Sequence, residues 1–149
     1  MQHWQVFEDC RAAVRFGGAW FNSEAKLVDC HFLRCHAGTG PCGGLSSANG
    51  ASVEMIRGSI MGCSGTSAAG VYIYGLSTLR LVDVTIAECR ATADDGNGGG
   101  IFMEASGGGL TMSPRGWDFF SPSCLQVAGR RACVWGAGVA PSGGRTYVR

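Results

Sequence analysis

The stretch Leu79–Ala105, LRLVDVTIAECRATADDGNGGGIFMEA, decides the fold of this chain. It begins with short aliphatic and β-branched runs, which are typical of strands rather than helices. The polar loop 94–97 then breaks the chain, because Gly and Asn tolerate positive φ. Gly99 and Gly100 lead into a second short apolar run at 101–103. The stretch therefore predicts strand, tight turn, strand and glycine corner, with no room for a helix.

Three earlier segments repeat this pattern. In each, a cysteine follows a large apolar residue by three positions, and the cysteines are 25, 28 and 26 residues apart. We call these paired positions the ladder: Phe7 with Cys10, Phe32 with Cys35, Ile60 with Cys63, and Ile86 with Cys89. The glycine corners recur at Gly18, Gly44, Gly70 and Gly100. A period of roughly 20 to 50 residues indicates a solenoid, whose units bury their faces against their neighbours. We therefore expect an all-β fold, a right-handed parallel β-helix of about four coils.

A column of charges follows the same period. Asp29, Arg57 and Asp83 each lie six residues before a ladder cysteine. Because neighbouring strands stack about 4.8 Å apart, acid, base and acid would alternate along one edge and favour this register. The alternative is a carboxylate pair for acid or base chemistry, in which Arg57 would lower both pKa values.

The combined pattern resembles a known family. The pattern begins with the motif apolar-x-apolar-x-Asp, which is followed by Phe or Ile, then by the ladder cysteine and then by Ala. It ends in a corner of two glycines and an apolar residue, as in Gly17–Trp20, Gly43–Leu45 and Gly99–Ile101. This is similar to the polymorphic outer membrane protein repeat of chlamydiae, and related repeats occur in pectate-lyase-like and autotransporter passenger proteins. The family's usual ladder residue is Asn, where this chain has Cys. The resemblance covers roughly residues 4–112 and implies an extracellular or cell-surface location. It does not imply one activity, because the fold hosts both enzymes and passive stalks.

Composition narrows the function classes. The 149 residues are 46% hydrophobic and 15% charged, which fits one folded domain rather than a disordered chain. The net charge of +1 gives no general attraction to nucleic acid. No signal peptide is visible, and no apolar run reaches the ~18 residues of a transmembrane helix. The repeats begin in mid-coil at Met1, so we expect neighbouring β-helix coils of a longer chain as partners.

The repeat pattern stops after residue 112. Residues 1–112 hold seven Lys and Arg against ten Asp and Glu, whereas residues 113–149 hold five Arg against Asp118 alone. The second segment contains three of the four prolines and no aliphatic column, and Cys124 and Cys133 fall outside the repeat. We expect residues 113–149 to form an irregular tail or cap.

The second coil has the densest reactive chemistry, namely Cys30, His31, Cys35, His36 and Cys42. Three interpretations stay open: a metal site, a Cys35–Cys42 disulfide, and free buried thiols. The spacing matches no common zinc motif, and buried cysteines behave as small apolar residues, which favours free thiols and no metal or cofactor. A second oxygen-rich group, Glu88, Asp94, Asp95 and Asn97, offers Ca²⁺ ligands but matches no calcium motif, which favours a solvated loop.

Aromatic residues supply the candidate contact surface. Tyr72 and Tyr74 alternate with Val71 and Ile73, and Trp20 and Phe102 occupy near-equivalent positions in other coils. An exposed aromatic stripe of this kind would stack on sugars or contact a surface protein. The alternative is ordinary packing under a loop.

Two function classes follow. The first is a structural or adhesive module that contacts glycans or proteins and has no catalytic residues. The second is a fragment of a carbohydrate-active enzyme, either a polysaccharide lyase or a glycoside hydrolase. Lys26 is the only lysine, and Arg57 falls between the two acids of its column rather than across a cleft. These positions favour the structural module.

Overall fold

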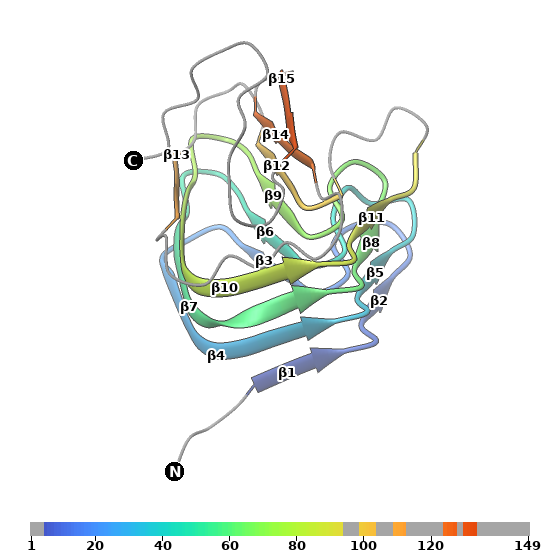
Figure 1. Cartoon of the computed structure of the whole chain (residues 1–149), viewed down its shortest axis with the longest axis horizontal. Coiled ribbons are helices and arrows are strands. Elements are labelled where there is room, and N and C mark those ends of the chain that lie inside the picture. The colour runs from blue at the N-terminus through green and yellow to red at the C-terminus, as the bar shows by residue number, and fades with distance from the viewer. Residues whose placement is uncertain (1–4, 94–98, 104–108, 113–123, 128–129, 134–149) are drawn as a thin grey trace.

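The computed structural model describes residues 5–93, 99–103, 109–112, 124–127 and 130–133. These residues form strands and no helix, and the strands stack into three sheets that wind as a parallel β-solenoid of about four turns. The long strands lie one above another at the front of Figure 1, and the short strands turn up behind them. The all-β fold and the solenoid are therefore confirmed.

Sheet A is the broadest of the three. Its strands pair in parallel in the order β1 (Gln5–Glu8), β4 (Ala25–Leu33), β7 (Ser52–Met61), β10 (Thr78–Ala87) and β13 (Gly109–Met112). The pairing places Phe7 beside Phe32, Phe32 beside Ile60, and Ile60 beside Ile86. Side chains alternate across each long strand on both sides of a one-residue shift in its middle, and Phe32, Ile60 and Ile86 point into the solenoid and are buried there. The apolar positions of the repeat thus form one continuous core.

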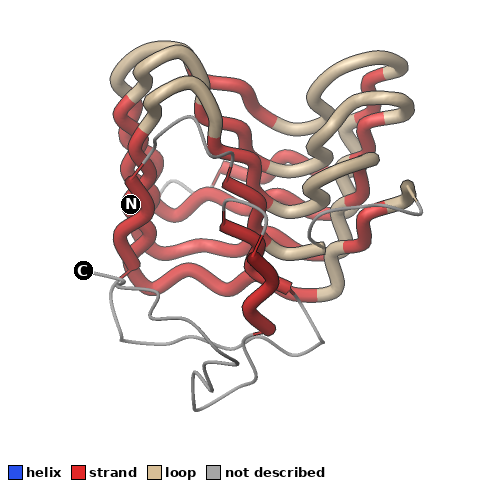
Figure 2. Tube along the Cα trace, turned by 90° about the horizontal axis from the view of Figure 1, so that it is seen from above, coloured by secondary structure: helices blue, strands red, loops and turns tan. Residues whose placement is uncertain are grey.

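Two smaller sheets complete each coil. Sheet B contains β2 (Arg11–Ala12), β5 (His36–Ala37), β8 (Ser64–Gly65) and β11 (Arg90–Ala91). Sheet C contains β3 (Ala19–Phe21), β6 (Leu45–Ser47), β9 (Val71–Ile73), β12 (Ile101–Met103), β14 (Cys124–Val127) and β15 (Arg130–Cys133). The coil therefore has three strands where the sequence indicated two, because the two-residue strands of sheet B are too short to show alternation. Figure 2 shows the loops that connect the sheets at the margins of the solenoid.

Two short strands lie within the segment 113–149, for which the sequence predicts an irregular tail or cap. Within it, β14 continues sheet C in parallel with β12, and β15 then pairs with β14 in antiparallel fashion. The backbone hydrogen bonds of a sheet do not require an aliphatic column, so the absence of that column did not exclude strands. The other positions of 113–149 lie outside the described residues.

The glycine corners lie directly over one another. The amide of Leu45 donates to the carbonyl of Gly70 at 2.8 Å, and the amide of Val71 donates to that of Gly100 at the same distance. A Cβ atom on Gly44 would stand 2.3 Å from the Gly70 oxygen. Glycine is therefore required where the coils pack closely at these corners.

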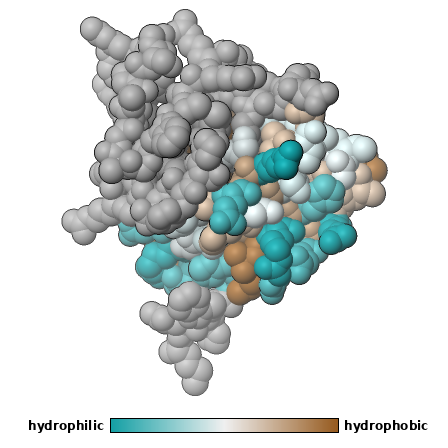
Figure 3. Space-filling view, turned by 45° about the vertical axis from the view of Figure 1, so that its right-hand side comes forward, coloured by the Kyte–Doolittle hydropathy of each residue, from teal (hydrophilic) through white to brown (hydrophobic). Residues whose placement is uncertain are grey.

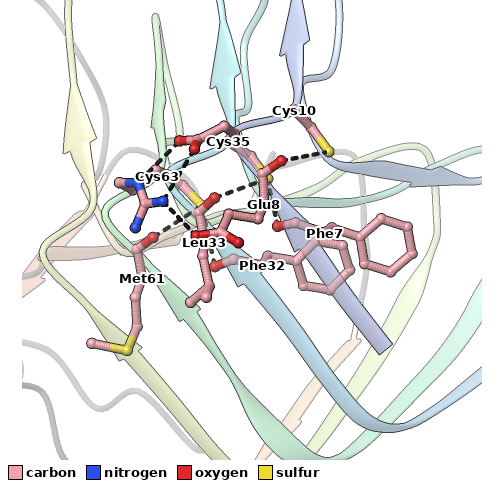
Figure 4. Close-up of polar contacts among 10 residues, drawn as sticks. Phe7, Glu8, Cys10, Phe32, Leu33, Cys35, Met61 and Cys63 are labelled. Carbon is pink, nitrogen blue, oxygen red and sulfur yellow. Dashed lines mark hydrogen bonds and ion pairs between the residues drawn. The ribbon is translucent and has the colours of Figure 1, made fainter. Parts of the chain in front are cut away.

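The ladder cysteines line the core beside the corner between sheets A and B. The thiol of Cys35 donates to the carbonyl of Phe7 at 3.2 Å, and Cys63 and Cys89 contact the carbonyls of Phe32 and Ile60 in the same way. Figure 4 shows the first three of these cysteines stacked from coil to coil. The six described cysteines, Cys10, Cys30, Cys35, Cys42, Cys63 and Cys89, are all free thiols, so Cys35 and Cys42 form no disulfide.

Candidate ligand-contact surface

The outer face of sheet C carries a stack of five aromatic rings. In spatial order these are Trp20, Phe16, Tyr74, Tyr72 and Phe102, which we call the aromatic stack. Successive ring centroids are 6.0, 6.4, 4.8 and 5.5 Å apart, and the rings are within 27° of parallel. The indole N–H of Trp20 also donates to the Tyr74 hydroxyl at 3.1 Å.

The strand register explains why these rings meet. Trp20, Ser46, Tyr72 and Phe102 occupy one row across the four coils. Ser46 interrupts the row of rings and is fully buried. Phe16 comes from the loop before β3 and stacks between Trp20 and Tyr74, so it bridges the gap. The structure thus brings the four predicted contact residues together and adds Phe16, which no periodic signal marks.

Most ring faces in the aromatic stack are in contact with a neighbouring ring. Tyr72 lies in the middle and is only 9% exposed, whereas Trp20 lies at the end and is 41% exposed. Near-parallel rings at these separations gain about 0.5–1.5 kcal/mol per pair beyond the area they bury. The middle of the stack therefore ties coils together, and the free indole face at Trp20 is the part that offers a surface to a ligand.

The outer face of sheet A carries charges that are paired from coil to coil. Glu54 forms ion pairs with Lys26 on one side and Arg80 on the other. Arg57 holds both carboxylate oxygens of Asp29, at 2.7 and 2.8 Å, and Arg34 holds those of Asp9 at 3.0 and 3.1 Å. These hydrogen bonds lower the pKa values of the acids Asp9, Asp29 and Glu54. A charged partner in the neighbouring coil thus holds each of these carboxylates ionised.

The charge column also bends the strands. Asp29, Arg57 and Asp83 adopt φ values of 53°, 52° and 52°, in the left-handed region. Asp enters this region readily, but Arg does so rarely. The bend turns Asp29 and Arg57 toward each other outside the core. Asp83 extends the column by one coil, and no ion pair joins it to another described residue.

A shallow groove runs across the start of the three long strands. Its lining residues are Glu24, Ala25, Lys26, Ser52, Val53, Glu54, Thr78, Leu79 and Arg80. Both bases of this groove, Lys26 and Arg80, pair with the single acid Glu54. A second lining acid, Glu24, forms no ion pair with another described residue. The described lining therefore offers no unpaired base beside an acid.

The remaining candidate sites are the two groups of metal-ligating residues, in the second coil and in the loop 88–97. No group of three or more His, Cys, Asp or Glu side chains converges within the described residues, although 94–98, with three of the proposed Ca²⁺ ligands, lie outside them. In the second coil, the ring nitrogen Nδ1 of His31 lies 2.9 Å from the Ser59 hydroxyl, and that of His36 lies 2.6 Å from the Ser64 hydroxyl. No described segment forms a helix with the length and apolarity that crossing a bilayer requires.

Comparison with known proteins adds no family. The chain matches no protein-family model, and neither the curated proteins nor the solved structures contain a match. The parallel β-solenoid is therefore established by the structure alone.

Proposed function

We propose that this chain is a structural or adhesive module of a surface protein, which contacts glycans or proteins and carries out no catalysis. The proposal includes the finer features that the repeat pattern implies, namely the right-handed, pectate-lyase-like winding and the likeness to the polymorphic outer membrane protein repeat. It also includes an extracellular or cell-surface location. A stack of coils with one fixed register is a rigid rod on which outward side chains keep constant positions.

One observation carries the proposal. On the outer face of sheet A, the acids Asp9, Asp29 and Glu54 are joined to bases of the neighbouring coil, and Asp83 is the exception. A general acid or base must exchange its proton near the working pH, and a neighbouring guanidinium moves a carboxyl group away from that range. These charged side chains hold neighbouring coils in register, and this supports a structural role for the chain.

The exposed end of the aromatic stack is the proposed contact point. The free face of Trp20 is large and apolar, which suits either a sugar ring or a protein side chain. The inner rings hold Trp20 in place, because Phe16 stacks on its opposite face and Tyr74 accepts its N–H.

The second candidate function is a fragment of a carbohydrate-active enzyme. Asp83 favours it, because this carboxylate stands in the column of the Asp29–Arg57 pair and forms no ion pair with another described residue. An acid beside an acid–arginine pair is the minimum for proton abstraction from a uronate sugar.

Two assays on the whole chain separate the classes. An array of glycans and surface proteins should retain the chain, and Trp20→Ala should weaken this retention. The control is Val28→Ala, which changes an exposed apolar residue on sheet A and should leave retention unchanged. An ultraviolet assay for unsaturated uronates should show no product. Product that disappears in Asp83→Asn would replace the structural module with a lyase, and binding unaffected by Trp20→Ala would remove the aromatic contact.

A further inference from the structure

A second surface, on sheet B, differs from sheet A in its charge balance. One residue from each short strand points outward, and the register places Arg11 beside His36, His36 beside Ser64, and Ser64 beside Arg90. We call these four residues the arginine row. Figure 3 brings this side of the molecule forward and shows separate hydrophilic groups among paler residues.

The two arginines of this row have no ion-pair partner among the residues that the structure describes. Arg11 and Arg90 are exposed, and neither forms an ion pair with a described residue, in contrast to Arg34, Arg57 and Arg80. Two acids flank the row. Asp9 lies two residues before Arg11 but is held by Arg34, and Glu88 lies two residues before Arg90 and is exposed.

The centre of the row adds another donor. Nδ1 of His36 and the hydroxyl of Ser64 are 2.6 Å apart, so one of them donates to the other. If the hydroxyl donates, the neutral imidazole carries its proton on Nε2. If Nδ1 donates, the serine hydroxyl keeps its own proton free. Either arrangement leaves one N–H or O–H of the pair for an outside acceptor.

The backbone holds these groups at fixed positions. The amides of His36, Ser64 and Arg90 donate to the carbonyls of Cys10, Cys35 and Cys63 at 2.8, 2.9 and 2.9 Å. At about 4.8 Å per coil, the two arginines stand roughly 14 Å apart with the His–Ser pair between them. A ligand that meets a prearranged row avoids part of the entropy cost of ordering the site.

We propose that the arginine row binds a linear glycan that carries sulfate groups, laid along the solenoid axis. This inference rests on the proposed function and adds the surface and the ligand class. Guanidinium groups form charge-assisted, forked hydrogen bonds with oxyanions, and a sulfate also accepts from a third direction, where the His–Ser donor lies.

The size of the row favours a glycan over other polyanions. Sheet B is two residues wide and four strands long, roughly 7 by 14 Å at the usual strand dimensions. A specific protein interface needs about 800 Å² from each partner, far more than this strip. Nucleic-acid binding relies on many phosphate contacts, and this chain has a net charge of only +1. A single narrow polymer fits the strip.

The test measures binding of a fluorescent heparin-derived octasaccharide to the whole chain. The same octasaccharide without sulfates, an oligogalacturonate and a short DNA duplex serve as comparison probes. We expect the sulfated probe to bind most tightly, with an affinity that falls as salt rises. The double variant Arg11→Gln/Arg90→Gln should lose about tenfold or more in affinity, since two charge-assisted contacts disappear.

Arg80→Gln is the matched control, because it removes an exposed arginine that is already paired with Glu54. It should bind as the unmodified chain does, and circular dichroism should show the same β-sheet signal in all variants. Equal binding by the double variant, an equal loss in Arg80→Gln, or equal affinity for another probe would overturn the inference. If the array retains the chain through uncharged ligands alone, the inference fails while the proposed function stands.

Discussion

At the scale of single residues, the structure depends on contacts that tolerate no extra atom. Gly44 lies where two coils pack closely at a glycine corner, and an added Cβ would also stand 2.8 Å from Ile60 Cγ2. Both neighbours are packed inside the fold, so relief requires the coils to separate. The sequence could predict this position, because the glycine recurs in every coil. It could not predict the left-handed φ of Arg57, which arises only once the strand bends.

Gly44→Ala should lower the free energy of unfolding by about 1–3 kcal/mol, the usual cost of overpacking a filled site. Urea denaturation followed by circular dichroism measures it. The control is Gly50→Asn, since Gly50 has a φ of 79° and nothing within 4 Å of an added Cβ, and Asn tolerates that φ. A Gly44→Ala variant as stable as the control would show that the coils are not packed at this corner.

The cysteines should differ sharply in reactivity. Burial raises the pKa of Cys42 to about 12, so almost no thiolate exists at neutral pH. Burial also raises the pKa of Cys10, but this thiol is partly exposed. Iodoacetamide at neutral pH followed by peptide mass mapping should find Cys10 labelled before the other five cysteines of residues 5–93, and Cys42 labelled only after unfolding. Rapid labelling of Cys42 in the folded chain would contradict its placement.

At the scale of elements, the long strands show how far sequence reasoning reaches. The apolar residues that recur from segment to segment predicted the long strands β4, β7 and β10. Within them the side-chain period of two shifts at the charge column, as in β10, where Leu81 is buried before Asp83 and Val84 is buried after it. The strands of sheet B are two residues long and β14–β15 lack aliphatic residues in a column, so no period exists to detect. Phe16 and the His36–Ser64 pair were missed for the same reason, since only the folded register brings them to their partners.

The ion pairs between long strands predict an acid-sensitive fold. Hydrogen bonds from Arg57 lower the pKa of Asp29, and those from Lys26 and Arg80 lower that of Glu54. A carboxyl group whose pKa is lower in the folded state stabilises it above the unfolded pKa and loses that effect as the pH falls through the folded value. Thermal unfolding should therefore show a melting temperature that drops below about pH 4.5.

Asp29→Asn serves as the control for this dependence. The variant should melt slightly lower at neutral pH, because an exposed ion pair contributes little, and should lose part of the acid sensitivity. A variant whose melting temperature follows pH as the unmodified chain does would show that the Asp29–Arg57 pair is not formed in solution.

At the scale of the whole molecule, the first coil is the exposed end of the described solenoid. No described strand pairs with the outer side of β1, β2 or β3, and the coil exposes Val6, Val14 and Trp20. An open sheet edge with apolar side chains is a template for pairing with another chain. The isolated chain should therefore self-associate through this coil.

Sedimentation velocity over a range of protein concentrations tests this expectation. Val6→Lys should shift the chain toward the monomer, because a charge on an edge strand opposes pairing. Val28→Lys places the same charge on an inner strand and should leave the association unchanged. Association that resists Val6→Lys, or a monomeric unmodified chain at high concentration, would show that this edge is covered.

The central claim is that the coils stack in parallel with one register, since the core, the ion pairs, the aromatic stack and the arginine row all depend on it. Backbone nuclear Overhauser contacts in an isotope-labelled sample test it most directly. The register predicts contacts from Phe32 to Ile60 and from Ile60 to Ile86, with the strands running in the same direction. Antiparallel contacts among β1, β4, β7 and β10, or a register between them shifted by even one residue, would contradict the account.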